Sequence, residues 1–383
     1  MKVYADNAAT TRMSDAALNA MLPILTDVYG NASSIHGVGQ EALKALDGAR
    51  SKIAAAIGAE PREIYFTSGG TESDNWAIAS AVTNGAKNGK RHIISTAIEH
   101  HAVLHKLKAS GCDVTLLTVD SDGLVTPEQV KAAIRPDTCL VTVMYANNEI
   151  GTIEPITEIG AVCREAGVPF HTDAVQAVGH VPVDVGAMNI DMLSLAAHKF
   201  HGPKGVGALY CNKKVRLNIF QEGGSQERGK RGGTENVAGA VGMAAALERS
   251  VADMDANAAK VAALRDRLIA GLTKIESTRV NGSLTHRLPG NANVCFEGIE
   301  GESLLLMLDM QGICASSGSA CTSGSLDPSH VLLAIGLPHG IAHGSLRLTL
   351  SEYNSDAEVD YILEHVAPIV ERLRMMSPVW QKK

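Results

Sequence analysis

The chain has 383 residues, a net charge of −7 and 45% hydrophobic residues, which predicts a substantial core in one large domain or two unequal ones. It contains no run of 18 apolar residues and no basic stripe interleaved with aromatics, so we expect neither a membrane span nor a nucleic-acid partner. Seven scattered cysteines without metal-ligand spacing, and an N-terminus without an apolar signal core, favour a reducing cytoplasm and no metal site.

Strands and helices alternate through the first two thirds of the chain. After an extended start, Ser14 begins a helix that runs to about Tyr29, and a second helix runs from about Gln40 to Ile57. Strands are then predicted, most of them followed by a helix, at 63–66, 92–96, 114–119, 140–146, 169–172, 190–196 and 206–210. Because such alternation produces parallel strands with helices on both faces, the sequence predicts a mostly parallel α/β sheet.

Residues 67–73, TSGGTES, follow the first of these strands and open a helix. A glycine turn at the start of a helix leaves backbone N–H groups that are suited to bind a phosphate. The alternative is an ordinary strand-to-helix turn with a Ser or Thr cap.

Two other strand ends carry charged side chains. Asp173 ends a strand in 170–176, FHTDAVQ, and Lys199 lies in a tight turn between two strands in 189–210, NIDMLSLAAHKFHGPKGVGALY. Ligands bind at such strand ends in open α/β sheets. A partly desolvated lysine forms Schiff bases with aldehydes, and a nearby carboxylate keeps a pyridine nitrogen protonated, as pyridoxal phosphate (PLP) requires. The alternative is a lysine in water, but three such pieces on three strand ends favour PLP.

The polar segment 220–236, FQEGGSQERGKRGGTEN, interrupts the pattern. Its composition favours a solvated loop, and the functional alternative is an arm that reaches a phosphate across a subunit interface, with Thr234 as hydroxyl donor. A helical region in one or two pieces, 235–272, then leads to a smaller α+β part. We expect its strands at 292–296 and 345–350 and its helices at 302–310 and 356–375.

Two reactive side chains lie in this smaller part. Residues 313–329, ICASSGSACTSGSLDPS, are rich in serine and glycine, which predicts a flexible segment with Cys321 in its middle. An exposed thiol is an oxidation liability unless its reactivity is used, and the alternative is a harmless surface cysteine. In 345–350, SLRLTL, the leucines alternate with Arg347 and Thr349. Arginine is a natural bidentate partner for a substrate carboxylate, and the alternative is an arginine on a solvated strand face.

Together these motifs resemble those of the cysteine desulfurases of the NifS/IscS type, in the class V aminotransferase superfamily and PLP fold-type I. The resemblance extends nearly end to end, and SSGSAC is specific for the class with an extended cysteine loop. The stretches that carry it are YADNAATT, GNASSIH, EIYFTSGGTES, EHHAVL, NNEIG, HTDAVQAVG, HKFHGPKGVGALY, QERGKRGGTENV, SSGSACTSGSLDPSHVL and HGSLRLTLSEYN.

The resemblance implies a large PLP-binding domain, 14–255, with a mostly parallel seven-stranded sheet between helices. A small α+β domain, 1–13 and 256–383, would carry the cysteine loop, about 314–329. It implies a cytoplasmic homodimer that converts L-cysteine to L-alanine and supplies sulfur for iron–sulfur cluster assembly. The acceptor would be a NifU/IscU-like scaffold protein or another sulfur acceptor, and a selenocysteine lyase or a class V aminotransferase is the alternative activity.

The resemblance also assigns roles to single residues. Lys199 would bind PLP as a Schiff base and move the α-proton, Cys321 would be the nucleophile that becomes a persulfide, and His100 would stack on the ring and shuttle protons. Arg347 would bind the substrate carboxylate. The further cofactor contacts would be Gly70, Thr71, Asn148, which also helps to place the substrate, Asp173, Gln176, His198 and Thr234 of the partner subunit. Family members usually have a phosphate-binding serine three residues before the lysine, where this chain has Ala196, so PLP affinity is expected to be lower unless another donor compensates.

Overall fold

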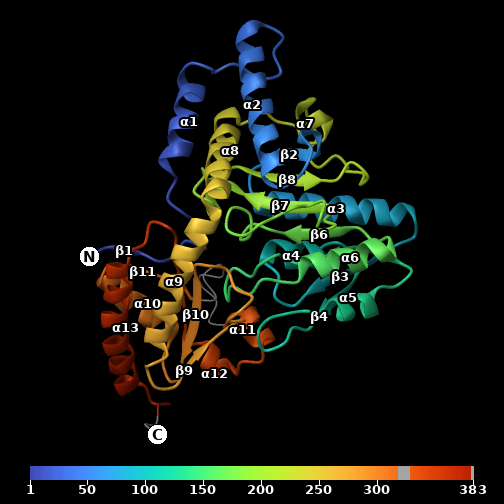
Figure 1. The fold of residues 1–383 in the computed structure, drawn as a ribbon. Coiled ribbons are helices and arrows are strands. Elements are labelled where there is room, and N and C mark those ends of the chain that lie inside the picture. Colours follow the sequence, from blue (N-terminus) through green and yellow to red (C-terminus); the bar gives the residue numbers. More distant parts are fainter. Residues whose placement is uncertain (318–327, 381–383) are drawn as a thin grey trace.

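The computed structural model describes residues 1–317 and 328–380, and its centre is a seven-stranded sheet (Figure 1). The strand order is β2-β8-β7-β6-β5-β3-β4, and β8 alone runs antiparallel to both of its neighbours. This confirms the predicted mostly parallel α/β sheet. The strands are β2 (Ile64–Thr67), β3 (His92–Thr96), β4 (Asp113–Leu117), β5 (Thr138–Thr142), β6 (Phe170–Asp173), β7 (Met192–Ala196) and β8 (Gly207–Cys211).

Helices cover both faces of this sheet, as its alternating apolar strands require. On β7, Leu193 and Leu195 belong to the core on one face of the sheet. Met192, one residue before Leu193, belongs to the core on the opposite face. The first core is completed by α2 (Gly37–Ala56), α5 (Pro127–Ala133), α6 (Ile156–Ala166) and α8 (Val237–Ala252). The core on the other face of the sheet is completed by α3 (Gly70–Lys87) and α4 (His101–Lys108). A further helix, α1 (Asp15–Thr26), packs on α8 (Figure 1).

A second core lies below the sheet in the view of Figure 1 and contains both terminal regions. Its three-stranded antiparallel sheet has the order β12-β10-β9, and β1 pairs in parallel with β11 although their residues lie some 310 positions apart. Its strands are β1 (Val3–Tyr4), β9 (Thr278–Val280), β10 (Asn291–Phe296), β11 (Ile313–Cys314) and β12 (Ser345–Thr349). Its helices are α9 (Met254–Leu272), α10 (Gly301–Met310) and α13 (Asp356–Met376), whereas α11 (His330–Ala334) and α12 (His339–Ala342) pack in a small separate cluster with Ile98, Met144 and Ile150.

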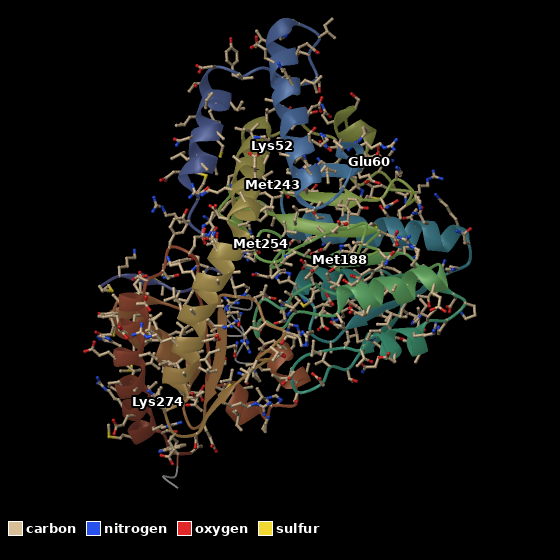
Figure 2. The ribbon with its side chains drawn as sticks, in the orientation of Figure 1. Lys52, Glu60, Met188, Met243, Met254 and Lys274 are labelled. Carbon is tan, nitrogen blue, oxygen red and sulfur yellow. The ribbon has the colours of Figure 1, made fainter. Side chains whose placement is uncertain are left out.

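The helical region that follows residue 235 consists of two helices, α8 and α9, which connect the two cores (Figure 1). Met243 points from α8 into the core beside the central sheet and is fully buried, and Met254 begins α9 (Figure 2). On the outer side of the same region Lys52 of α2 pairs with Glu248 of α8 at 2.8 Å. No helix in the described residues is long and apolar enough to cross a membrane.

Most residues of 220–236 are exposed, as expected, but the segment is anchored at two points around the short turn α7 (Gln226–Gly229). The side chain of Glu227 is only 3% exposed, and its two oxygens accept hydrogen bonds from Arg50 at 2.8 and 2.9 Å. Arg231 pairs with Glu72 at 2.8 Å. Composition alone does not reveal these two anchors, because Glu227 and Arg231 find their partners on helices far away in the sequence.

Candidate active site

A cavity of about 280 Å³ lies where the strand ends of the central sheet meet the second core. It receives residues from the start of α3, the ends of β6 and β7, β12 and the N-terminal segment. The lining residues are Ala8, Ala9, Gly70, Thr71, Asp74, His100, Met144, Ala146, Asn148, Asp173, Val175, Gln176, Ala196, His198, Lys199 and Arg347. Every residue that the sequence predicts for the site is in this lining except Cys321, which lies outside the described residues, and Thr234, which is exposed on the surface.

Lys199 ends a short 3₁₀ turn, η2 (Ala197–Lys199), that directly follows β7. Its Nζ donates hydrogen bonds to the backbone carbonyls of Ala8 at 2.6 Å and Ala9 at 2.9 Å. The backbone of the turn is held as well, since the Lys199 carbonyl lies 2.9 Å from His180 Nε2. The alternative interpretation, in which this lysine points into bulk water, is therefore wrong.

Asp173 and Asp74 form a buried pair of carboxyl groups at the floor of the cavity. Burial raises the pKa of Asp173, and the nearby His100 and Lys199 side chains and a hydrogen bond from the Val175 N–H oppose that rise. Burial and the neighbouring Asp173 raise the pKa of Asp74 well above its usual value, and the two side chains are hydrogen-bonded to each other. These effects favour the protonated form at Asp74 more strongly than at Asp173.

The sequence interpretation did not single out Asp74. The residue lies four positions after Gly70, so both face the same side of α3. That spacing was the available signal, because a helix that opens on a ligand also turns its fifth residue toward it. His171 Nε2 approaches Asp74 Oδ1 to 3.7 Å, and this oxygen has no hydrogen-bond partner within the described part of the chain.

His100 caps the start of α4, where its Nδ1 accepts a hydrogen bond from the Ala102 N–H at 3.2 Å. Burial lowers the pKa of His100, and the charge of Lys199 lowers it further against the opposing effect of Asp173. The ring is therefore neutral, with its proton on Nε2. His101 instead contacts His105 and His330, with ring centroids 5.1 and 4.8 Å apart, so the adjacent histidines face different surroundings.

Arg347 lies on β12 with a side chain only 3% exposed, so the alternative of a solvated strand face is wrong. Its Nη2 pairs with Asp6 Oδ1 at 2.9 Å, and its Nη1 donates to the Asn148 carbonyl at 3.2 Å. Its Nε has no hydrogen-bond partner among the described residues. A buried guanidinium in the lining of a cavity is suited to receive a carboxylate.

The start of α3 forms the end of the cavity that suits a phosphate. Gly69 is the N-cap, and Gly70 and Thr71 of the first turn line the cavity, where the backbone N–H groups of a helix start suit a phosphate. A Cβ added to Gly70 would lie 2.6 Å from a methyl carbon of Val175, so glycine is required for this close approach. His198 lies nearby, and burial together with Lys199 lowers its pKa to about 4. An uncapped helix start, a lysine and a buried carboxylate in one cavity fit the donor set that PLP needs.

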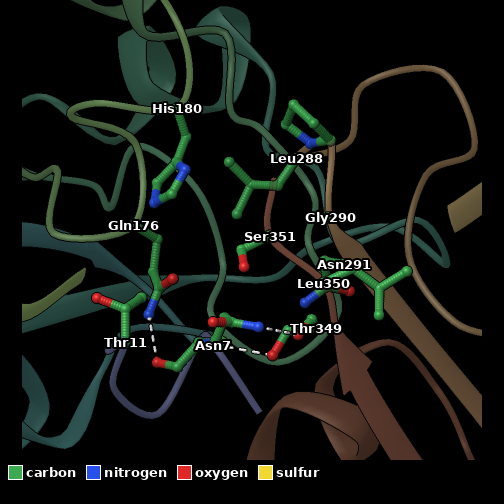
Figure 3. Close-up of a pocket in the computed structure, with 12 residues that line it drawn as sticks. Asn7, Thr11, Gln176, His180, Leu288, Gly290, Asn291, Thr349, Leu350 and Ser351 are labelled. Atoms are coloured by element: carbon green, nitrogen blue, oxygen red, sulfur yellow. Dashed lines mark hydrogen bonds between the residues drawn. The ribbon is translucent and has the colours of Figure 1, made fainter. Parts of the chain in front are cut away.

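A smaller cavity of about 40 Å³ adjoins the first and shares Ala8 and Gln176 with it (Figure 3). Gln176 donates to the Ala8 carbonyl at 3.0 Å, and Ala8 N–H donates to the Thr349 hydroxyl at 2.8 Å. The Asn7 side chain donates to the Thr349 carbonyl at 2.8 Å. These bonds fix the N-terminal segment between β12 and the central sheet, and so fix the wall that contacts Lys199.

Residues 3–362 match the protein family described as Aminotransferase class-V. The chain belongs to the class V aminotransferase family. Among curated proteins of this family, the cysteine desulfurase IscS of Methanosarcina thermophila is 54% identical, with 100% of this chain and 95% of the relative covered. The cysteine desulfurase IscS of Clostridium botulinum (strain Hall) is 52% identical, with 99% and 97% covered.

Solved structures of class V aminotransferases share the whole fold. A NifS-like protein superposes with a TM-score of 0.92 at 39% identity, with 97% of this chain and 100% of the other covered. The structure described as SspA in complex with cysteine has a TM-score of 0.81 at 38% identity, with 92% and 100% covered. The resemblance inferred from the motifs is thereby confirmed at the level of family and fold.

The buried Glu99 beside His100 is expected to make the stability of this class V aminotransferase depend on pH. Burial raises the pKa of Glu99 to about 8, although Thr96 and the Met144 N–H both donate to Oε1. An unfolded glutamate loses its proton near pH 4.5, so unfolding releases a proton between that pH and about 8. The free energy of unfolding should therefore fall as pH rises through this window, by up to about 1.4 kcal/mol per pH unit.

Urea unfolding between pH 5 and 8 tests this expectation. Glu99→Gln mimics the protonated acid, since its amide oxygen still accepts both bonds, and should flatten the dependence of unfolding free energy on pH. Glu128→Gln, at an exposed position of α5, is the matched control and should leave the slope as in the parent. An unchanged slope in Glu99→Gln would show that Glu99 is ionised in the folded chain.

Proposed function

We propose that this chain is a PLP-dependent cysteine desulfurase, which converts L-cysteine to L-alanine and leaves the sulfur as a persulfide on Cys321. The observation that carries the proposal is the convergence of Lys199, Asp173 and Arg347 on one cavity. They provide an amine, a buried carboxylate and a carboxylate-binding guanidinium. Two curated relatives above 50% identity named cysteine desulfurase support the choice of substrate, as does a related protein whose structure contains cysteine.

The cavity residues divide the binding of PLP between them. Bound PLP would supply an electron sink for the carbanion formed at the substrate α-carbon. Lys199 would hold its aldehyde carbon, Asp173 would keep a proton on the pyridine nitrogen and the neutral His100 ring would stack on it. Gln176 would contact the ring oxygen and Asn148 would help to place ring and substrate. Gly70, Thr71 and His198 would bind the phosphate, and Ala196 presents only a methyl group there.

The remaining chemistry is performed by side chains of the chain itself. Arg347 binds the substrate carboxylate and so fixes the α-carbon against Lys199. The Lys199 amine removes the α-proton and returns it during turnover, and His100 moves protons to and from substrate atoms above the ring. The Cys321 thiolate attacks the substrate sulfur and forms an S–S bond. The electron pair of the broken S–C bond stays with the carbon skeleton, which takes up a proton and leaves as alanine.

We further propose that two copies of the chain form a homodimer in which Thr234 of the partner subunit completes the phosphate site. Thr234 is exposed, and so are Leu22 and Leu25 on α1 and Ile35 before α2. Such apolar side chains on one end of the molecule are suited to association. In this proposal residues 14–255 form the PLP-binding domain, and residues 1–13 and 256–383 form the small domain.

The sulfur would leave for an iron–sulfur scaffold protein of the NifU/IscU kind or for another acceptor. A cytoplasmic setting suits this role, because the cysteines that the structure describes are all free thiols. A selenocysteine lyase and a class V aminotransferase are the competing activities, and the second of these has no use for a thiol nucleophile.

Replacing Cys321 with serine separates these activities. The variant is expected to form alanine from L-cysteine at least about a hundredfold more slowly, because a hydroxyl cannot accept the sulfur as a persulfide. The measurement is alanine and sulfide release from enzyme that retains its visible PLP absorbance. Cys112→Ser, which changes a free thiol outside the cavity lining, is the control. Release of both products at the parent rate would refute the assignment of Cys321 as nucleophile.

A further inference from the structure

The guanidinium that is assigned to the substrate carboxylate already has a carboxylate partner in the chain. Asp6 Oδ1 lies 2.9 Å from Arg347 Nη2, and the two side chains are 18% and 3% exposed. The Asn148 carbonyl accepts from Nη1 at 3.2 Å, while Nε has no partner among the described residues. An incoming carboxylate therefore meets a guanidinium that is already paired with a negative charge.

Asp6 is held in this position by the backbone on both of its sides. Thr349 N–H donates to the Ala5 carbonyl at 2.7 Å, and Asn7 N–H donates to the Thr349 carbonyl at 3.2 Å. Asp6 is thereby bridged to Thr349, two residues after Arg347 on the same strand. An ion pair whose two backbones are hydrogen-bonded to one strand pays little entropy to keep its geometry, unlike a pair of long surface side chains.

The charges around Arg347 are already close to balanced. Besides Asp6, the buried Glu149 lies close enough for the positive charge of Arg347 to lower its pKa against the larger effect of burial. Glu149 is tied to α11 through a hydrogen bond from Ser329. A substrate carboxylate beside the guanidinium would enter as an additional negative group, and its attraction to Arg347 would be opposed by Asp6 at close range.

We propose that Asp6 is a positioning residue with two effects on the carboxylate subsite. Its oxygen holds Arg347 through Nη2 in the lining of the cavity, and its charge weakens the binding of amino-acid carboxylates. Because L-cysteine and L-alanine carry the same carboxylate, the same charge speeds the departure of the product. This inference rests on the proposed assignment of Arg347 to the substrate carboxylate.

Two substitutions separate the two effects. Asp6→Asn keeps an oxygen for Nη2 and removes the charge, so the dissociation constant of L-alanine and the KM for L-cysteine should both fall about three- to tenfold. Asp6→Ala removes the oxygen as well, so it should bind L-alanine less tightly than Asp6→Asn does. The binding measurement is calorimetric titration of the PLP-loaded enzyme with L-alanine. Asp15→Asn, which neutralises an exposed aspartate paired with Arg12, is the charge-matched control and should leave both constants unchanged.

The outcomes distinguish this inference from the proposed function. If Arg347→Gln leaves the L-alanine dissociation constant unchanged, the carboxylate is bound elsewhere and both proposals about Arg347 are wrong. If Arg347→Gln weakens binding at least about tenfold but Asp6→Asn does not tighten it, the charge effect of Asp6 alone is refuted. Equal affinities in Asp6→Asn and Asp6→Ala would refute its positioning effect.

Discussion

Replacing Lys199 with alanine is expected to abolish alanine formation from L-cysteine, with a loss of about a thousandfold or more. The side chain has two tasks in the proposed reaction, covalent attachment of PLP and movement of the α-proton, and alanine can perform neither. The measurement is alanine release under saturating L-cysteine and PLP. Reduction with borohydride gives a second readout, because the reducible linkage between PLP and the parent chain should be absent from the variant.

Lys204→Ala is the matched control for this experiment. Lys204 is an exposed lysine five residues farther along the same connection between β7 and β8, and it does not line the cavity. Its removal should leave turnover and the reducible linkage intact. If the Lys199→Ala enzyme kept either the linkage or the parent rate, another amine would have to bind PLP. The proposed mechanism would then be wrong.

The sequence located the strand ends well because local patterns determine them. The expected strand at 92–96 coincides with β3. Turn residues at the ends of an apolar run mark where a strand stops, so such ends can be read from the sequence. The strand expected at 140–146 is assigned as β5 only to Thr142. The difference is small in physical terms, because Val143 N–H still donates to His171 and Tyr145 N–H to Asp173 beyond the assigned end.

The pairs that tune the site could not be read from local patterns. Asp6 and Arg347 are separated by 341 positions, and Asp74 meets Asp173 only because α3 packs against the strands that follow it. Alternation within 345–350 correctly separates Arg347 from the leucines, yet it reports nothing about what faces the arginine. Burial of that face is a property of the contact between the two cores, which only the folded chain defines.

Replacing Asp173 with asparagine is expected to lower turnover at least about a hundredfold. The Asp173 carboxylate would hold a proton on the pyridine nitrogen, and a neutral amide gives that proton no charged partner. Asp74→Asn should be milder, with a loss below about tenfold, because the amide N–H can still donate to Asp173 as the protonated acid does. The measurement is kcat for L-cysteine in both variants, with PLP occupancy determined from absorbance.

The contrast between the two carboxyl positions makes this prediction specific. In the folded chain the protonated form is favoured more strongly at Asp74, since burial and the neighbouring carboxyl group raise the pKa of Asp74 while His100 and Lys199 oppose the rise at Asp173. An asparagine amide therefore resembles the protonated acid that is favoured at position 74. At position 173 it replaces the carboxylate that the proposed reaction needs. If Asp74→Asn were the more damaging change, the charge would reside on Asp74, and the partner of the pyridine nitrogen would have to be reassigned to α3.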